Sequence, residues 1–130
     1  MIRIKESDIV TSPRVSQMLV KAGAPIMTAS HYWLGIEGHL KVYCIKEGVW
    51  DDNVFKNATE KGHIIPAWDV NSLLAPAIFK GSLLIKGSSL YEVQLVDKDT
   101  NEMFYGCAQT LPDALAFCIT RSLEENKNKI

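Results

Sequence analysis

Apolar residues recur along this chain with two periods, one typical of helices and one typical of strands. After Ser12-Pro13, apolar side chains follow at helical spacing and Gly23 with Pro25 ends the run; these apolar residues are Val15, Met18, Leu19 and Ala22. Serine is a good N-cap, proline is tolerated at the first helical position, and glycine adopts the left-handed conformation that ends a helix. The pattern predicts a helix over residues 13–22.

The next stretch is rich in aromatic and β-branched residues, and Glu37-Gly38 interrupts it. This composition predicts a hairpin with strands over residues 31–36 and 39–46. Gly38 would supply the positive φ that a tight turn requires.

Polar residues and glycines dominate the middle of the chain. The composition of residues 47–65 predicts a long surface loop with one helical turn near 52–60. Loops of this length are usually functional or mobile. Asp69 is placed to cap a short helix over residues 69–75. Pro76 predicts a kink there, because proline removes a helical hydrogen bond and clashes with the preceding turn.

The last third of the chain returns to strand-like runs and closes on a helix. Strands are predicted over residues 82–86, 90–96 and 102–108, separated by short turns. The sequence Thr110-Leu111-Pro112-Asp113 fits a capping box that begins the closing helix. The polar tail at about 125–130 is expected to fray.

The predicted order of elements is αββαβββα. Short turns between consecutive strands favour antiparallel pairing. We therefore expect a single α+β domain over residues 1–130, with an antiparallel sheet of about five strands and helices packed on one face.

Composition limits the class of protein further. The chain has 130 residues, 47% of them apolar, and a formal net charge of −1, so it can bury an ordinary core. Lysines and arginines are scattered, which disfavours a nucleic-acid partner. The first ten residues are too polar for a signal peptide, and no apolar run approaches the ~20 residues that cross a bilayer. The expectation is a cytoplasmic protein with no membrane contact.

Cysteines and histidines offer little chemistry in this pattern. Cys44, Cys107 and Cys118 form no CxxC motif and lie among apolar neighbours, so we expect reduced and mostly buried thiols. No cofactor motif and no metal motif occurs. One hypothesis remains a metal enzyme or small hydrolase that uses His31, His39 and His63. In this hypothesis His31 and His39 face each other across the hairpin.

Aromatic residues carry the better claim to function, since Tyr and Trp often anchor binding surfaces. Trp33, Tyr91 and Phe104 are expected in the core. Trp50 and Phe55 lie in the predicted polar loop. We expect them either to contact a partner or to pack over the sheet as a clamp. The candidate partner-contact residues are Trp50, Phe55, Tyr32 and Tyr43.

Four phrases give the chain a family resemblance: SPRVSQMLVKAGAP, HYWL, IPAWDVNSLLAP and TLPDALAFCI. Over residues 9–123 they resemble a group of small uncharacterised proteins from phages, prophages and related mobile elements. Residues 90–125 are also similar in topology to the HicB-like antitoxin core. The first resemblance implies a mobile-element origin, and the second implies a regulatory role.

Three functional hypotheses follow. The first is a non-enzymatic accessory protein that acts through contacts with another protein or with a second copy of itself as a homodimer. The second is a nucleic-acid-linked regulator of the antitoxin or transcription-associated kind, which near-neutral charge weakens. The third is the histidine-based enzyme.

Overall fold

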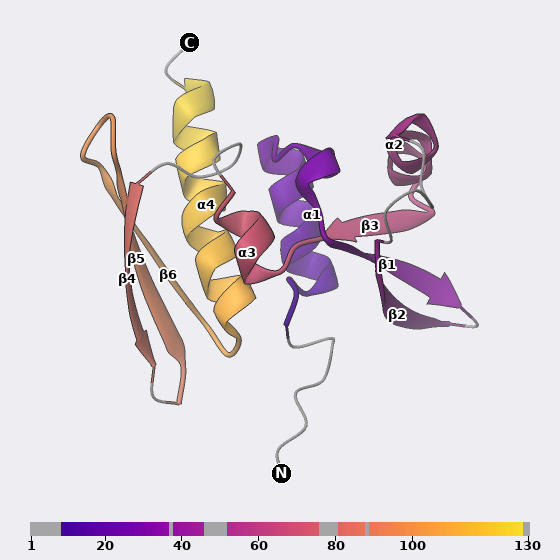
Figure 1. Ribbon diagram of the computed structural model, residues 1–130, viewed down its shortest axis with the longest axis horizontal. Coiled ribbons are helices and arrows are strands. Elements are labelled where there is room, and N and C mark those ends of the chain that lie inside the picture. The colour runs from indigo at the N-terminus through magenta and orange to yellow at the C-terminus, as the bar shows by residue number, and fades with distance from the viewer. Residues whose placement is uncertain (1–8, 37, 46–51, 76–80, 88, 129–130) are drawn as a thin grey trace.

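The computed structural model describes residues 9–36, 38–45, 52–75, 81–87 and 89–128. These residues form an α+β fold that contains two three-stranded antiparallel sheets. Three helices, α1, α3 and α4, stand between the sheets, as Figure 1 shows. The prediction of the α+β class is confirmed, whereas the prediction of one sheet of about five strands with helices on one face is wrong.

Helix α1 (Pro13–Ala22) has the predicted bounds and both predicted caps. The Ser12 hydroxyl accepts the amide N–H of Val15 at 3.5 Å. Gly23 has a φ of 98°, and its N–H bonds to the carbonyls that end the helix. Local capping groups therefore mark both limits of this helix.

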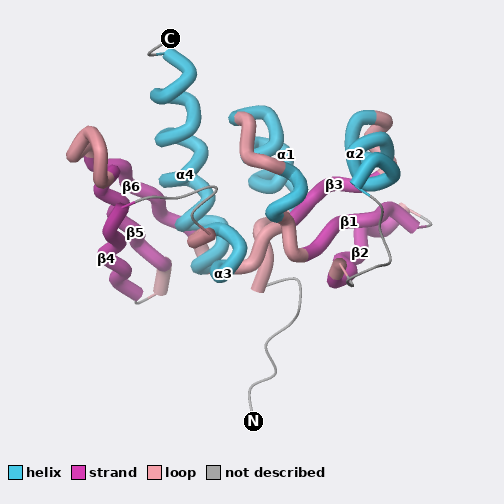
Figure 2. The backbone as a smooth tube through the Cα atoms, turned by 45° about the horizontal axis from the view of Figure 1, so that its top comes forward, coloured by secondary structure: helices cyan, strands magenta, loops and turns pink. Residues whose placement is uncertain are grey.

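The first sheet has the order β2-β1-β3. Strands β1 (His31–Ile36) and β2 (His39–Cys44) form the predicted hairpin, with Gly38 at a φ of 81° in the turn. Strand β3 (Ile64–Ala67) pairs with the other side of β1. Figure 2 shows this sheet at one end of the molecule.

Within the stretch predicted as a surface loop, the described residues 52–65 are more regular than expected. Helix α2 (Asp52–Glu60) spans the whole stretch where one turn was expected, and β3 begins soon after it. The sequence did not predict this strand because it contains Pro66, and proline is excluded from central strands. It is tolerated here since β3 is an edge strand.

Helix α3 (Val70–Leu73) begins as expected, because the Asp69 carboxylate accepts the amide N–H of Ser72 at 2.8 Å. It contacts α4, and its Leu73 is fully buried. The kink predicted at Pro76 lies outside the described residues.

The second sheet has the order β4-β5-β6 and consists of β4 (Gly81–Gly87), β5 (Tyr91–Asp97) and β6 (Met103–Ala108). All three strands were predicted to within a residue. They form a separate sheet because α1, α3 and α4 lie between them and the first sheet. The six strands are thus divided into two layers on either side of the helices.

Helix α4 (Leu111–Asn128) packs on β5 and β6 and also contacts α1 and α3. It continues through Glu125, where fraying was expected, because its Glu and Lys residues are good helix formers. The predicted capping box does not form. The Thr110 hydroxyl is buried without a hydrogen-bond partner in the described residues, and the Asp113 carboxylate instead accepts the amide N–H of Ser12 at 2.8 Å.

Thr11 is fully buried where the first sheet meets the helices. Its carbonyl oxygen accepts the indole N–H of Trp33 at 2.9 Å and the Ser16 hydroxyl at 3.1 Å. Its hydroxyl accepts the amide N–H of Trp68 at 3.1 Å, and its own N–H donates to the Trp68 carbonyl at 2.9 Å. This residue joins the chain start, α1, β1 and the segment after β3.

Helices of the length and apolarity that a bilayer requires do not occur in the described part of the chain.

Candidate protein-binding surface

The two faces of the second sheet differ in what covers them. Side chains alternate between the faces of a strand, and Val93 and Leu95 of β5 point toward α4, where both are buried. Phe104 of β6 lies opposite Leu95 and packs on the same core. We call this helix-covered side the inner face.

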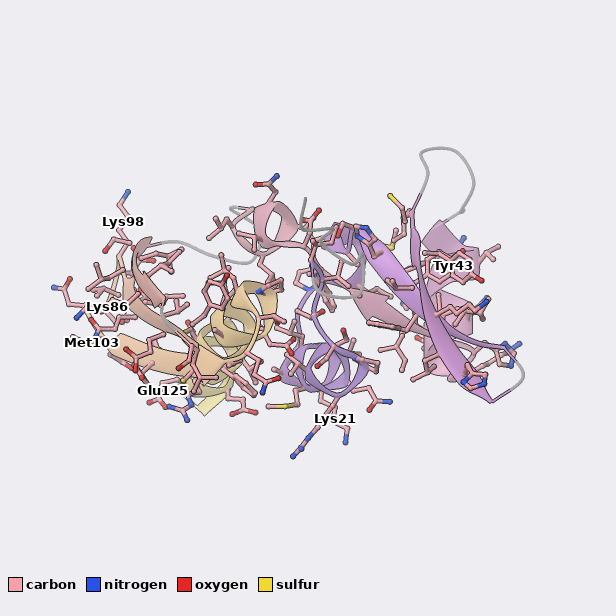
Figure 3. All side chains as sticks on the ribbon, turned by 90° about the horizontal axis from the view of Figure 1, so that it is seen from below. Lys21, Tyr43, Lys86, Lys98, Met103 and Glu125 are labelled. Carbon is pink, nitrogen blue, oxygen red and sulfur yellow. The ribbon has the colours of Figure 1, made fainter. Side chains whose placement is uncertain are left out.

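The opposite side, the outer face, carries a group of apolar side chains in the described residues. Leu84 is 51% exposed, Met103 is 64% exposed and Tyr105 is 42% exposed. Val96 lies half-buried beside them. These four residues, Leu84, Val96, Met103 and Tyr105, define the outer patch. In Figure 3, Met103 and Lys86 point away from α4 on this side of the sheet.

Strand register brings the members of the outer patch together. Leu84 and Tyr105 lie on either side of Gln94, each opposite it across a strand pair. Met103 lies opposite Val96 in the next row. Since neighbouring strands are about 4.8 Å apart, the patch forms one contiguous surface on three strands.

Charged groups at the border of the patch are matched rather than of one sign. Lys86 of β4 lies opposite Glu92 of β5. A hydrogen bond with the Glu92 carboxylate, together with a smaller desolvation effect, raises the pKa of Tyr105 above its ordinary value. In this hydrogen bond the Tyr105 phenol is the donor and the Glu92 carboxylate is the acceptor.

The acidic residues between β5 and β6 build the turn that sets this register. The Asp97 carboxylate accepts the amide N–H groups of Asp99 at 2.8 Å and Thr100 at 3.2 Å. Asn101 adopts a φ of 59°, a conformation that asparagine tolerates. The Asp97 carboxylate thus stabilises the turn through local backbone hydrogen bonds.

The structure describes three of the four aromatic residues that the sequence singled out. Tyr32 and Tyr43 are opposite each other on β1 and β2, with ring centroids 5.6 Å apart and planes inclined by 23°. Both are half-buried. Phe55 is only 1% exposed, which fits the packing alternative and leaves little of its ring for a partner. Trp50 lies outside the described residues.

Three other aromatic residues were expected in the core. Trp33 is buried and Phe104 packs on the core, as predicted. Tyr91 is 40% exposed, so that expectation is wrong. Tyr91 stands on the inner face at the start of β5, opposite Gly87.

The structure does not bring His31 and His39 together. His31 pairs with Cys44 at the open end of the hairpin, whereas His39 pairs with Ile36 beside the turn. Two strands of six residues place these histidines at opposite ends, so the expectation that they face each other is wrong. In the residues that the structure describes, no three His, Cys, Asp or Glu side chains gather in a way that could hold a metal.

The cysteines are free thiols in three environments: Cys118 is buried, Cys107 is half-buried and Cys44 is exposed. Burial raises the pKa of the Cys118 thiol to about 11. The expectation of buried cysteines is therefore correct for Cys118 and wrong for Cys44, which ends the edge strand β2.

Sequence reasoning missed Leu84 and Met103 as surface residues. The available signal was a pair of apolar runs, Leu83-Leu84-Ile85 and Met103-Phe104-Tyr105. In a strand, consecutive apolar residues must point to both faces. Either both faces are covered or apolar side chains are left exposed, and the structure shows the second arrangement.

Comparisons with family models, curated proteins and solved structures give no match to this chain. The surface must be interpreted from its own geometry.

Proposed function

We propose that this chain is a non-enzymatic binding protein that contacts another polypeptide through its outer patch. The observation that carries the proposal is the exposure of Leu84, Met103 and Tyr105 on one sheet face. Exposed apolar groups that are contiguous and bordered by polar residues are typical of protein interfaces. Tyrosine provides a rigid anchor and methionine an adaptable one.

A protein partner fits this surface better than a nucleic acid does. Phosphate contacts require an excess of positive charge, whereas Lys86 on this face lies opposite Glu92. The formal net charge of the chain is −1. The cytoplasmic, mobile-element setting expected from the sequence remains part of this proposal.

A photo-crosslinking experiment tests the proposal. Benzoylphenylalanine would replace Tyr105 in one protein and Tyr43 in another, and each would be irradiated in cells that make the chain. Both sites are tyrosines on a sheet, but only Tyr105 belongs to the outer patch. We expect a discrete polypeptide adduct from position 105 and none from position 43.

The variant Met103→Lys should abolish the adduct at position 105, because it places a charge in the middle of an apolar contact. Leu40→Lys is the control, since Leu40 is also a large apolar residue exposed on a strand, in this case of the first sheet. An adduct that survives Met103→Lys, or crosslinking confined to position 43, would contradict the proposal.

A further inference from the structure

Strand β4 is the outer strand of the second sheet, and its chemistry is unusual for a strand in that position. Within the described residues its strand neighbour is β5, on one side only. Its backbone N–H and C=O groups on the other side form an edge that another strand can extend. Natural edge strands usually carry a central charge, a proline or a bulge, which discourages pairing.

The centre of β4 has none of these protections. It reads Leu83-Leu84-Ile85, with Lys86 placed toward the end. Leu84 lies on the outer face and is 51% exposed, while Ile85 lies on the inner face and is 45% exposed. Helix α4 packs on β5 and β6. The apolar surface at this edge is therefore open on both sides of the sheet.

From this edge we infer that the chain forms a homodimer in which β4 pairs antiparallel with β4 of a second copy. The register is centred on Leu84, so that the two Leu84 residues lie opposite each other. Leu83 then lies opposite Ile85 of the second copy, and Ser82 lies opposite Lys86 of the second copy. The glycines that end the strand, Gly81 and Gly87, also pair with each other.

Self-complementarity is the reason that a second copy fits this edge. Every pair in the register matches apolar with apolar or polar with an uncharged polar group, and no like charges are opposed. Each pair also joins two residues of the same face. Ser82, Leu84 and Lys86 lie on the outer face, whereas Leu83 and Ile85 lie on the inner face. The apolar face of one copy therefore continues into that of the other.

The pairing would complete both faces of the sheet. A twofold axis perpendicular to the sheet places the two α4 helices on the same side, with Leu83 and Ile85 of both copies filling the space between them. On the outer face, the two copies of Leu84 would join the outer patches across six strands. The inference thus rests on the proposed function for its role, since it doubles the binding surface.

The contact is a short strand pair, so we expect a dimer with a Kd in the micromolar range rather than a permanent one. Sedimentation equilibrium under reducing conditions measures it, with a reductant present because Cys44 is exposed. Wild-type protein should pass from monomer to dimer between low micromolar and submillimolar concentration. A monomer throughout this range would overturn the inference.

Leu84→Lys sets two lysines directly opposite each other on the dimer axis. Like charges in this position destabilise strand pairing, so the Kd should rise about tenfold or more. Met103→Lys is the control, because it adds the same charge to the same face but on β6. It should leave the dimer intact while it abolishes the crosslink at position 105.

The register itself is tested at Ser82, which is exposed. Ser82→Glu would face Lys86 of the second copy twice in each dimer and should tighten the Kd several-fold, whereas Ser82→Lys should weaken it by a similar factor. Exchanging the two residues, Ser82→Lys with Lys86→Ser, restores the pairing and should return the Kd to that of the wild type. Equal affinity in all these variants would overturn the register.

The two proposals fail separately. A crosslinked partner at position 105 together with a strictly monomeric chain would remove the homodimer and leave the proposed function. A dimer that obeys the charge pattern without any adduct at position 105 would remove the proposed function and leave the dimer.

Discussion

The two sheets of this chain expose their edges to solvent in different ways. In the first sheet, edge strand β3 contains Pro66, which lacks an amide donor, and edge strand β2 carries Lys41 near its centre. Both features are common protections against further strand pairing. In the second sheet, edge strand β4 has Leu83-Leu84-Ile85 at its centre.

The two sheets also differ in which of their strands a helix covers. Helix α2 packs against β3 at the first sheet, and Phe55 is buried on that helix. Helix α4 covers β5 and β6 but leaves Ile85 of β4 exposed. On the proposal made above, the first sheet is complete within one copy, whereas the second sheet offers its β4 edge for association.

The largest effect is expected where α4 approaches the second sheet. A Cβ atom at Gly106 would lie 2.2 Å from the Ala114 carbonyl oxygen and 3.0 Å from the Cys118 sulfur. Because the backbone of α4 would have to move, Gly106→Ala should cost about 3 kcal/mol of the free energy of unfolding. Urea denaturation followed by circular dichroism measures this loss.

Gly35→Ala is the matched control in the first sheet. A Cβ atom at Gly35 would meet only the Leu40 side chain, at an ordinary 3.8 Å. Its effect on the free energy of unfolding should stay within about 1 kcal/mol. Equal losses from the two substitutions would show that the second sheet is not packed more closely on its helix.

An intermediate effect is expected at Thr11, which ties the first sheet to the helices. Thr11→Val keeps the shape of the side chain but removes the acceptor for the Trp68 amide N–H. An unsatisfied buried donor should lower the free energy of unfolding by about 1–3 kcal/mol. Thermal and urea unfolding should agree on this loss.

Thr120→Val provides the comparison within α4. The Thr120 hydroxyl is buried and has no hydrogen-bond partner in the described residues. Replacing it with a methyl group removes an uncompensated polar group, so stability should be unchanged or should rise by up to about 1 kcal/mol. A loss as large as that of Thr11→Val would mean that the two hydroxyls are equally bound.

The smallest effect concerns thiol chemistry and leaves the fold unchanged. It compares an exposed cysteine of the first sheet with a buried cysteine of α4, the helix that covers the second sheet. Burial raises the pKa of Cys118 from 9.0 to about 11, while Cys44 is exposed at the edge of the first sheet. At pH 8 a thiol reagent should label Cys44 in the folded protein and label Cys118 only after unfolding. Rapid labelling of Cys118 would place it outside the core.

The same shift gives a pH dependence of stability. The folded state holds the Cys118 proton more tightly than the unfolded state does, so its contribution to stability is complete below pH 9. This contribution should decline as the pH rises from about 9 to about 11. Cys118→Ala should remove this part of the pH dependence.

Local signals predicted much of this fold. Helix α1 and the hairpin that follows it depend on Ser12, Gly23 and Gly38, whose roles are decided within a few residues. The partition of six strands into two sheets could not be predicted in this way. It depends on which helix lies between which strands, and on β3, whose Pro66 is at odds with strand propensity.

The candidate surface was predictable only in part. Alternation together with the strand register puts Leu84, Met103 and Tyr105 on the face opposite Val93 and Leu95. Which of these faces α4 would cover is a tertiary fact that alternation does not contain. The capping box at Thr110 failed for a similar reason, because the Asp113 carboxylate bonds to Ser12, a residue far away in the sequence.

Amide hydrogen exchange at two protein concentrations tests the central contrast between the edges most directly. Exchange in β4 and in β2 would be followed by mass spectrometry at micromolar and at submillimolar protein, under reducing conditions. The account predicts that β4 amides exchange more slowly at the higher concentration, whereas β2 amides do not change. Exchange in β4 that is independent of concentration, or slowing confined to β2, would contradict it.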